Sequence, residues 1–102
     1  MRLAHYSQAK LNSELKKIIS KHLDLNKYKL FYFGSRVTQK GDERSDIDIG
    51  ISGLNPLDSE LLANIREDID KLPTLYSFDI VDFNNVSENF KSVALQKIEY
   101  IN

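Results

Sequence analysis

Apolar residues near the start of the chain recur at intervals of three and four. Between residues 7 and 23 they fall on one side of a helical cylinder, and lysines occupy the other side. The apolar set is Leu11, Leu15, Ile18 and Ile19. Ser7 precedes this pattern, and its hydroxyl is expected to cap the first turn. The pattern therefore predicts an amphipathic helix over residues 7–23.

Three later stretches have the pattern of β-strands. Residues 29–33 end in four consecutive apolar side chains, which is typical of a strand covered on both faces. Residues 46–52 alternate strictly, so that isoleucines share one face and polar residues share the other. Residues 77–83 read SFDIVDF and favour a third strand. One face of this strand carries Phe78, Ile80 and Asp82, and the other face carries Asp79, Val81 and Phe83.

Two further helices are expected, one between the last two strands and one after them. Residues 57–72 carry apolar side chains at helical spacing. Asn55 is the expected N-cap, Pro56 suits the first turn, and Pro73 marks the end. Residues 87–101 show the same spacing and predict a last helix.

The segment between the first two strands is polar and short. Residues 35–40 favour a helical turn, and residues 41–45 favour a charged loop. The order of elements predicts an α/β (α+β) fold in which helices pack on a small mixed β-sheet. The length predicts a single domain over residues 1–102.

Composition narrows the classes of function. The 102 residues include 14 Lys and Arg against 15 Asp and Glu, which leaves no basic stripe for tight binding to nucleic acid. The lack of cysteine excludes a disulfide scaffold and thiolate zinc sites. No apolar run has membrane-spanning length, and no secretory leader is evident. We therefore expect a soluble cytoplasmic protein without membrane or strong nucleic-acid binding.

Two aspartates stand side by side in the second strand. Asp46 and Asp48 project from the same face, about 6.6 Å apart at roughly 3.3 Å per residue. Like charges placed in this way repel each other, and aspartate is a poor strand former. A fold tolerates the arrangement most readily when a cation lies between the two carboxylates. The pair alone is a weak signal, because exposed strand edges often carry two acids.

A glycine and a serine end the first strand, ten residues before the paired acids. Gly34 allows a sharp turn and the close approach of an anion, and Ser35 offers a hydroxyl and an amide donor. Groups that donate hydrogen bonds to phosphate, placed beside hard carboxylate oxygens, indicate a Mg²⁺-dependent site for a nucleoside triphosphate. Such a site usually needs a third carboxylate. Alternation places only one of Asp79 and Asp82 on the active face, and we favour Asp79.

The cations nearest to this motif are Arg36 and Lys40. They could contact a triphosphate, and they could equally be solvated surface charges. Other motifs do not fit, because Lys40 is misplaced for a Walker A loop and residues 46–50 lack the further acids of a calcium loop.

The glycine-serine pair, the ten-residue interval and the sequence Asp46-Ile47-Asp48 together resemble the signature of the nucleotidyltransferase superfamily that includes DNA polymerase beta. The short length and the stretch over residues 72–83 are similar to its minimal nucleotidyltransferase branch. The resemblance covers nearly the whole chain. It implies the polymerase beta-like nucleotidyltransferase fold.

The resemblance also implies roles for the candidate residues. Asp46 and Asp48 would hold two Mg²⁺ ions, for which Mn²⁺ can substitute. Asp79 would ligate the catalytic ion and help to activate the acceptor hydroxyl. Gly34 and Ser35 would hold the β- and γ-phosphates of the nucleotide.

One loop departs from the family pattern. Relatives often carry an arginine and then a glycine where this chain has Thr38 and Gln39, and here the glycine comes later, at Gly41. The shape of the loop is therefore open, and so is the choice between Arg36 and Lys40 as the residue that meets the triphosphate.

The resemblance implies an enzyme that transfers a nucleoside monophosphate, with AMP from ATP as the first expectation, to a hydroxyl of a protein partner. Members of the branch are paired with a small all-helical protein of the HEPN or substrate-binding type, so a hetero-oligomer is expected. In some pairs the nucleotidyltransferase is an antitoxin that adenylylates its partner. The alternative is a non-catalytic antitoxin or assembly subunit that neutralises its helical partner by binding.

Overall fold

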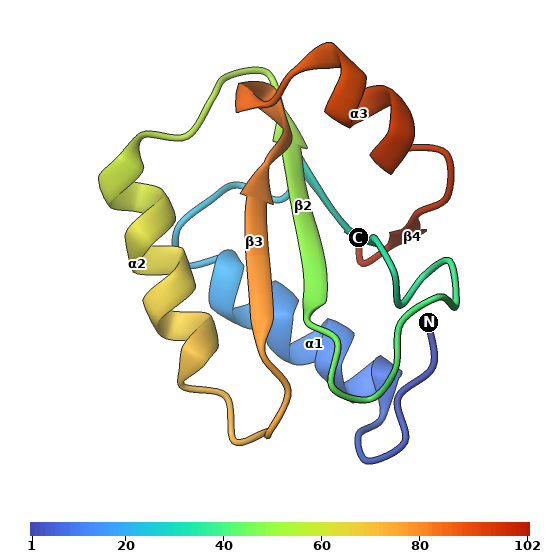
Figure 1. The fold of residues 1–102 in the computed structure, drawn as a ribbon. Helices are drawn as coiled ribbons and strands as arrows, with labels where there is room; N and C mark the ends of the chain where they lie inside the picture. The colour runs from blue at the N-terminus through green and yellow to red at the C-terminus, as the bar shows by residue number, and fades with distance from the viewer.

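The computed structural model describes all residues, 1–102, as helices packed on a four-stranded mixed sheet (Figure 1). The elements are α1 (Gln8–Ile19), β1 (Tyr28–Phe33), β2 (Ile47–Gly53), α2 (Ser59–Asp70), β3 (Phe78–Asp82), the 3-10 turn η1 (Phe83–Asn85), α3 (Glu88–Ala94) and β4 (Glu99–Tyr100). The strand order is β3-β2-β1-β4, and only the β2–β3 pair is parallel. The predicted fold class is therefore confirmed. None of the helices has the length and apolar character that crossing a lipid bilayer requires.

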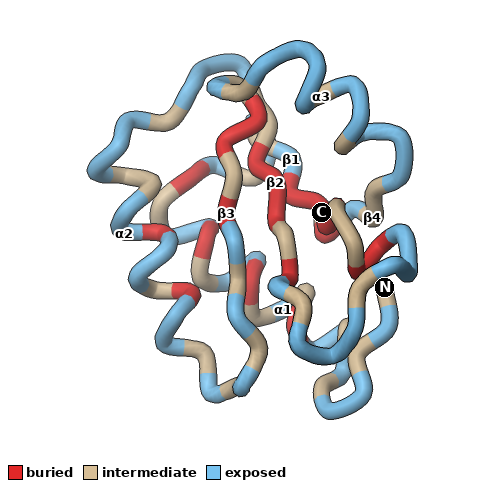
Figure 2. Tube along the Cα trace, viewed as in Figure 1, coloured by how far each residue is buried: buried red, intermediate tan, exposed pale blue.

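One face of the sheet carries the main core. The alternation in β2 turns Ile47, Ile49 and Ile51 to this face, where each is fully buried. They pack with Leu15 of α1 and Ile65 of α2, which lie in the same cluster. Burying a side chain of this size contributes about 1.5–3 kcal/mol. Figure 2 shows the buried positions following the strands and the inner sides of α1 and α2.

The opposite face carries a smaller aromatic core. Phe31 and Phe33 of β1 and Phe83 of η1 are buried together. The Phe83 ring packs edge-on against both strand rings, with centroid distances of 4.8 Å to Phe31 and 5.0 Å to Phe33. Helix α3 packs beside this cluster, but none of its residues is buried. Asp46 and Asp79 lie on the same face and are exposed. The second face is therefore covered only in part.

The first helix begins as predicted and ends sooner. Ser7 is its N-cap, with the Ser7 hydroxyl accepting a hydrogen bond from the Lys10 N–H at 3.2 Å. The helix ends at Ile19, and turns carry the chain onward through Leu23. The predicted end at residue 23 was therefore too late.

The second helix begins later than predicted, and its cap is different. The side chain of Asp58, not Asn55, caps α2 by accepting a hydrogen bond from the Leu61 N–H at 2.7 Å. The Leu57 N–H donates instead to the buried carboxylate of Asp82, at 2.8 Å. Because this contact holds the chain outside the helix, residues before Asp58 do not join it.

The last predicted helix was wrong beyond Ala94. The chain leaves α3 there and returns as β4, antiparallel to β1. Ile101 N–H donates to the Leu30 carbonyl at 2.8 Å, and Leu30 N–H donates to the Asn102 side-chain oxygen at 2.6 Å. These bonds occupy backbone groups of β1 that would otherwise form an open sheet edge. Edge pairing therefore overrides the helical spacing of residues 95–101.

Candidate active site

The parallel pairing of β2 with β3 brings the predicted carboxylates to one place. Asp48 and Asp79 are direct partners in the register. Asp46 precedes Asp48 by two residues and so shares its face, and the Ile47 N–H bond to the Ser77 carbonyl (2.8 Å) fixes the start of β2 beside the segment before β3. We call Asp46, Asp48 and Asp79 the acidic cluster. Its members come from two strands and would not be recognised as neighbours without the register.

Gly34 lies against the acidic cluster. It follows β1, whose last residue, Phe33, pairs with Asp48. A Cβ atom added to Gly34 would come within 2.1 Å of Asp48 Oδ2. The backbone of Gly34 also has φ +82°, which side chains rarely adopt. Glycine is thus required here both for the turn and for the approach to the carboxylate.

The electrostatic environment of Asp48 disfavours its charge. Burial, and then the neighbouring charges of Asp79 and Asp46, raise the pKa of Asp48 from 3.8 to about 6. Asp48 is half-buried, whereas the other two carboxylates are exposed. A cation placed among them would reverse this penalty.

The donor set suits a hard divalent ion. Three carboxylates on one face offer the oxygen ligands that Mg²⁺ prefers. As they stand, no three acidic or histidine side chains of the chain close around a common point that could hold an ion. The acidic cluster therefore fits Mg²⁺ by chemistry and by shared face, and its side chains would turn inward to bind it.

A helical turn follows Gly34, as predicted. The Thr38 N–H donates to the Gly34 carbonyl at 3.1 Å, and the Lys40 N–H donates to the Ser35 carbonyl at 2.9 Å. Gln39 closes the turn with φ +62°, in the left-handed region. All the hydrogen bonds of Ser35 use its carbonyl oxygen, which leaves its hydroxyl and its N–H free. The turn thus presents unused donors beside Asp48.

These donors open into a pocket of about 810 Å³. One side is formed by the end of β1, the turn after it and Asp48. The other side is formed by α3 and the residues that follow it. The full lining is Phe33, Gly34, Ser35, Thr38, Lys40, Asp48, Asn89, Phe90, Val93, Ala94, Gln96 and Lys97. Of the two candidate cations, the structure brings Lys40 to this pocket and does not bring Arg36 there.

The contribution of α3 was missed from the sequence. Phe90 and Val93 belong to the helical spacing that predicted one long helix over residues 87–101, yet both are exposed in the structure. Asn89, Gln96 and Lys97 belong to no motif. Their place in the pocket depends on where the chain turns back to form β4, and no local pattern shows that.

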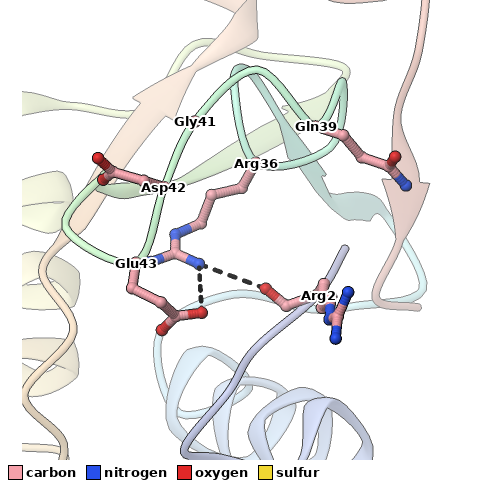
Figure 3. A pocket seen from close by; sticks show the side chains of 6 residues that line it. All are labelled: Arg2, Arg36, Gln39, Gly41, Asp42 and Glu43. Atoms are coloured by element: carbon pink, nitrogen blue, oxygen red, sulfur yellow. Dashed lines mark hydrogen bonds and ion pairs between the residues drawn. The ribbon is translucent and has the colours of Figure 1, made fainter.

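Arg36 lies on the other side of the turn and is buried. Its guanidinium donates to the Ser45 carbonyl at 2.8 Å and to the Arg2 carbonyl at 3.3 Å, and it lies 3.8 Å from a Glu43 carboxylate oxygen. It also stacks over the Tyr76 ring at 4.9 Å. Figure 3 shows Arg36 reaching toward the N-terminal segment, within a separate cavity of about 320 Å³. In this arrangement Arg36 holds the loop that ends at Asp46.

Asp82 has a different surrounding from Asp79. Its carboxylate is 7% exposed and accepts hydrogen bonds from the N–H groups of Leu57 and Asn84, at 2.8 and 2.9 Å. It therefore ties β3 to the segment that leads into α2. Asp79 is the aspartate of this strand that lies beside Asp48.

A mixed sheet with a glycine-serine turn beside strand-borne aspartates is the arrangement of a nucleotidyltransferase domain. Residues 13–101 match the family described as Polymerase beta, Nucleotidyltransferase, and the chain belongs to this family. The predicted membership is thus confirmed.

Individual relatives agree with this assignment. The chain is 30% identical over 66 residues to the probable protein adenylyltransferase MntA of Haemophilus influenzae, a match that covers 65% of this chain and 58% of the relative. The chain thus spans less than two thirds of the length of that curated relative.

Solved structures share the fold. A chain in the crystal structure of a mutant MntA–HpeT toxin–antitoxin has a TM-score of 0.72 at 15% identity, covering 89% of this chain and 72% of that one. A chain in the structure of a tri-AMPylated Shewanella oneidensis HEPN toxin in complex with its MNT antitoxin has a TM-score of 0.61 at 20% identity. That match covers 93% of this chain and 72% of the other.

Proposed function

We propose that this protein is a Mg²⁺-dependent nucleotidyltransferase that transfers AMP from ATP to a hydroxyl group on a small helical partner of the HEPN type. One observation carries the proposal. Asp48 is in register with Asp79, follows Asp46 on the same face and lies against Gly34, and Asp48 and Gly34 both line a pocket of about 810 Å³. Carboxylates, a glycine-serine turn with free hydrogen-bond donors and a pocket large enough for a nucleotide thus lie side by side.

The acidic cluster, Ser35 and Lys40 would have different roles in the reaction. Asp46 and Asp48 would hold the ions, and Asp79 would complete the site and accept the proton of the acceptor hydroxyl. Two bound Mg²⁺ ions, or Mn²⁺ in their place, stabilise the charge on the attacking and leaving oxygens of a phosphoryl transfer. The free N–H and hydroxyl of Ser35 would donate to the β- and γ-phosphates, with Lys40 as the nearby cation.

The reaction is an in-line displacement at the α-phosphorus of ATP. The acceptor oxygen forms a bond to this phosphorus, and the bond from phosphorus to the β-phosphate oxygen breaks. Pyrophosphate leaves, and the acceptor becomes an AMP ester. The hydroxyl proton passes to Asp79, which is exposed and therefore accessible to an incoming hydroxyl.

The acceptor is expected on another polypeptide. The acidic cluster lies on the partly covered face of the sheet, so a second protein can reach Asp79 directly. The similarity to a probable protein adenylyltransferase, and to chains from toxin–antitoxin complexes of which one holds an AMPylated HEPN toxin, supports this choice. A complex between the two proteins is the expected functional unit.

The test is transfer of label. The protein, a candidate helical partner, Mg²⁺ and ATP labelled in the α-phosphate should yield a labelled partner and free pyrophosphate. Asp46→Asn and Asp79→Asn should each abolish transfer, because one charged ligand is lost. Asp70→Asn is the matched control, since Asp70 is exposed at the end of α2, and it should transfer normally. Partner neutralisation without any label, by the parent and by Asp46→Asn alike, would favour the binding antitoxin instead.

A further inference from the structure

The pocket beside the acidic cluster has two chemically different sides. Ser35, Lys40 and Asp48 make one side polar and charged. The opposite side is formed by α3 and the residues after it, where the exposed apolar side chains of Phe90 and Val93 lie among the amides and Lys97. A nucleoside triphosphate has the same division, with phosphates at one end and an aromatic base at the other.

The Phe90 ring is held in place and yet remains open to a ligand. It contacts Phe33 at 6.0 Å between ring centroids, nearly perpendicular at 83°, and it contacts Phe83 at 5.7 Å and 57°. These two buried rings anchor the ring of Phe90, whose residue is still 41% exposed. An anchored aromatic ring with free surface is a platform for a planar base.

Two amide side chains lie on the same side of the pocket. Asn89 and Gln96 line it, and neither side chain has a hydrogen-bond partner within the chain. An amide donates and accepts together, so it can pair with the N6 and N7 atoms of adenine. Guanine presents two acceptors at the equivalent edge and cannot pair with an amide in this way.

We propose that α3 and the residues after it form the base subsite of this protein, in which the Phe90 ring stacks on adenine and the Asn89 and Gln96 amides read its edge. This inference rests on the proposed function and names the part of the chain that selects the nucleotide. The occupied pocket would then place the phosphates at Ser35 and the base against α3. A volume of about 810 Å³ is within the range of pockets that enclose ligands of this size.

The experiment separates base binding from phosphate binding. Calorimetric titrations in Mg²⁺ would use the α,β-methylene analogues of ATP and GTP, which cannot undergo transfer, and inorganic triphosphate, which has no base. Phe90→Ala should weaken binding of the ATP analogue roughly tenfold or more, because the loss of one stacked base on alanine substitution lowers affinity by about that factor. Its affinity for inorganic triphosphate should stay within twofold of the parent. Replacing Asn89 and Gln96 together by alanine should remove the preference for the ATP analogue over the GTP analogue.

Three further variants make the result specific. Leu95→Ala truncates an apolar residue of similar exposure, 42%, that lies outside the pocket lining, and it should bind as the parent does. Phe90→Tyr keeps the ring and should restore affinity. Phe90→Leu keeps apolar volume without the ring and should remain weak while melting near the parent temperature, which covers the case in which Phe90→Ala fails to fold.

Three outcomes overturn the base subsite. One is an equal loss of affinity for the ATP analogue and for triphosphate in Phe90→Ala and Phe90→Leu, and another is no loss of affinity for either. A parent protein that binds triphosphate but no analogue better than triphosphate would likewise remove any role for α3, while leaving the phosphate site standing. A parent that binds neither nucleotide nor triphosphate would refute the proposed function itself.

Discussion

Removing one charge from the acidic cluster is expected to stabilise the protein in the absence of ions. Asp48→Asn keeps the side-chain size and removes the charge. Burial, followed by Asp79 and Asp46, raises the pKa of Asp48 from 3.8 to about 6, so at neutral pH the folded chain holds a charge that its surroundings disfavour. If the whole pKa shift were converted into free energy, the Asp48 charge would destabilise the folded state by about 3 kcal/mol. Because Asp48 is only half-buried, solvent screening leaves about 1 kcal/mol, and the melting midpoint should rise by roughly 4–8 °C.

The same pKa fixes how the effect depends on pH. A carboxyl whose pKa is raised by folding binds its proton more tightly in the folded chain, so its contribution to stability falls as pH rises from about 4 to about 6. Below pH 3.8 Asp48 is neutral in both states, and the advantage of the variant should vanish. At pH 4.5 the advantage should be about a third of its value at pH 7.5.

The assay is thermal unfolding followed by circular dichroism in EDTA, at pH 4.5 and pH 7.5, for the parent, Asp48→Asn and the exposed control Asp70→Asn. The control should have the same melting midpoint as the parent at both pH values. Mg²⁺ with ATP at a hundredfold excess over the dissociation constant should stabilise the parent by about 2.7 kcal/mol, and Asp48→Asn should lose most of that response. The reasoning is refuted if the variant melts at or below the parent at pH 7.5, or if its advantage is the same at both pH values.

Two other predictions concern the turn between β1 and β2. Arg36→Lys should lower stability by about 2 kcal/mol, because an ammonium cannot replace the guanidinium bonds to the Ser45 and Arg2 carbonyls; an unchanged melting midpoint would show that these bonds are dispensable. Gln39→Gly should raise stability by about 0.5–1 kcal/mol, because φ +62° strains a side chain but not glycine. Thr38→Gly in the same turn should do the opposite, and a loss of stability in both variants would contradict the argument from strain.

The sequence was most informative where burial follows a local period. Ile47, Ile49 and Ile51 alternate because β2 has a buried face and a carboxylate face, and that alternation is visible without a structure. The helices on the main core were predicted for the same reason, and only their ends were misplaced. Those ends depend on caps such as Asp58, whose bond to the Leu61 N–H is one of several that the sequence allows.

The sequence was least informative where a residue contacts a distant part of the chain. Arg36 was an expected candidate for phosphate, but the structure buries it against carbonyls at positions 2 and 45. No period or motif reports that the N-terminal segment passes this point. The same reason accounts for β4, because its pairing with β1 joins residues about seventy positions apart.

The position of the acidic cluster follows from how much of the sheet this chain can cover. Helices α1 and α2 cover the face that carries the isoleucines of β2, and only the short α3 remains for the other face. Its Phe90 ring docks on the Phe33 and Phe83 rings, and Asp46 and Asp79 on the same face stay exposed. An uncovered face costs stability, but a fully covered one would leave no route for a nucleotide or for a hydroxyl on another protein. The pocket between Asp48 and Phe90 is thus a consequence of incomplete coverage, and the two sides of that pocket are where nucleotide specificity and chemistry should separate.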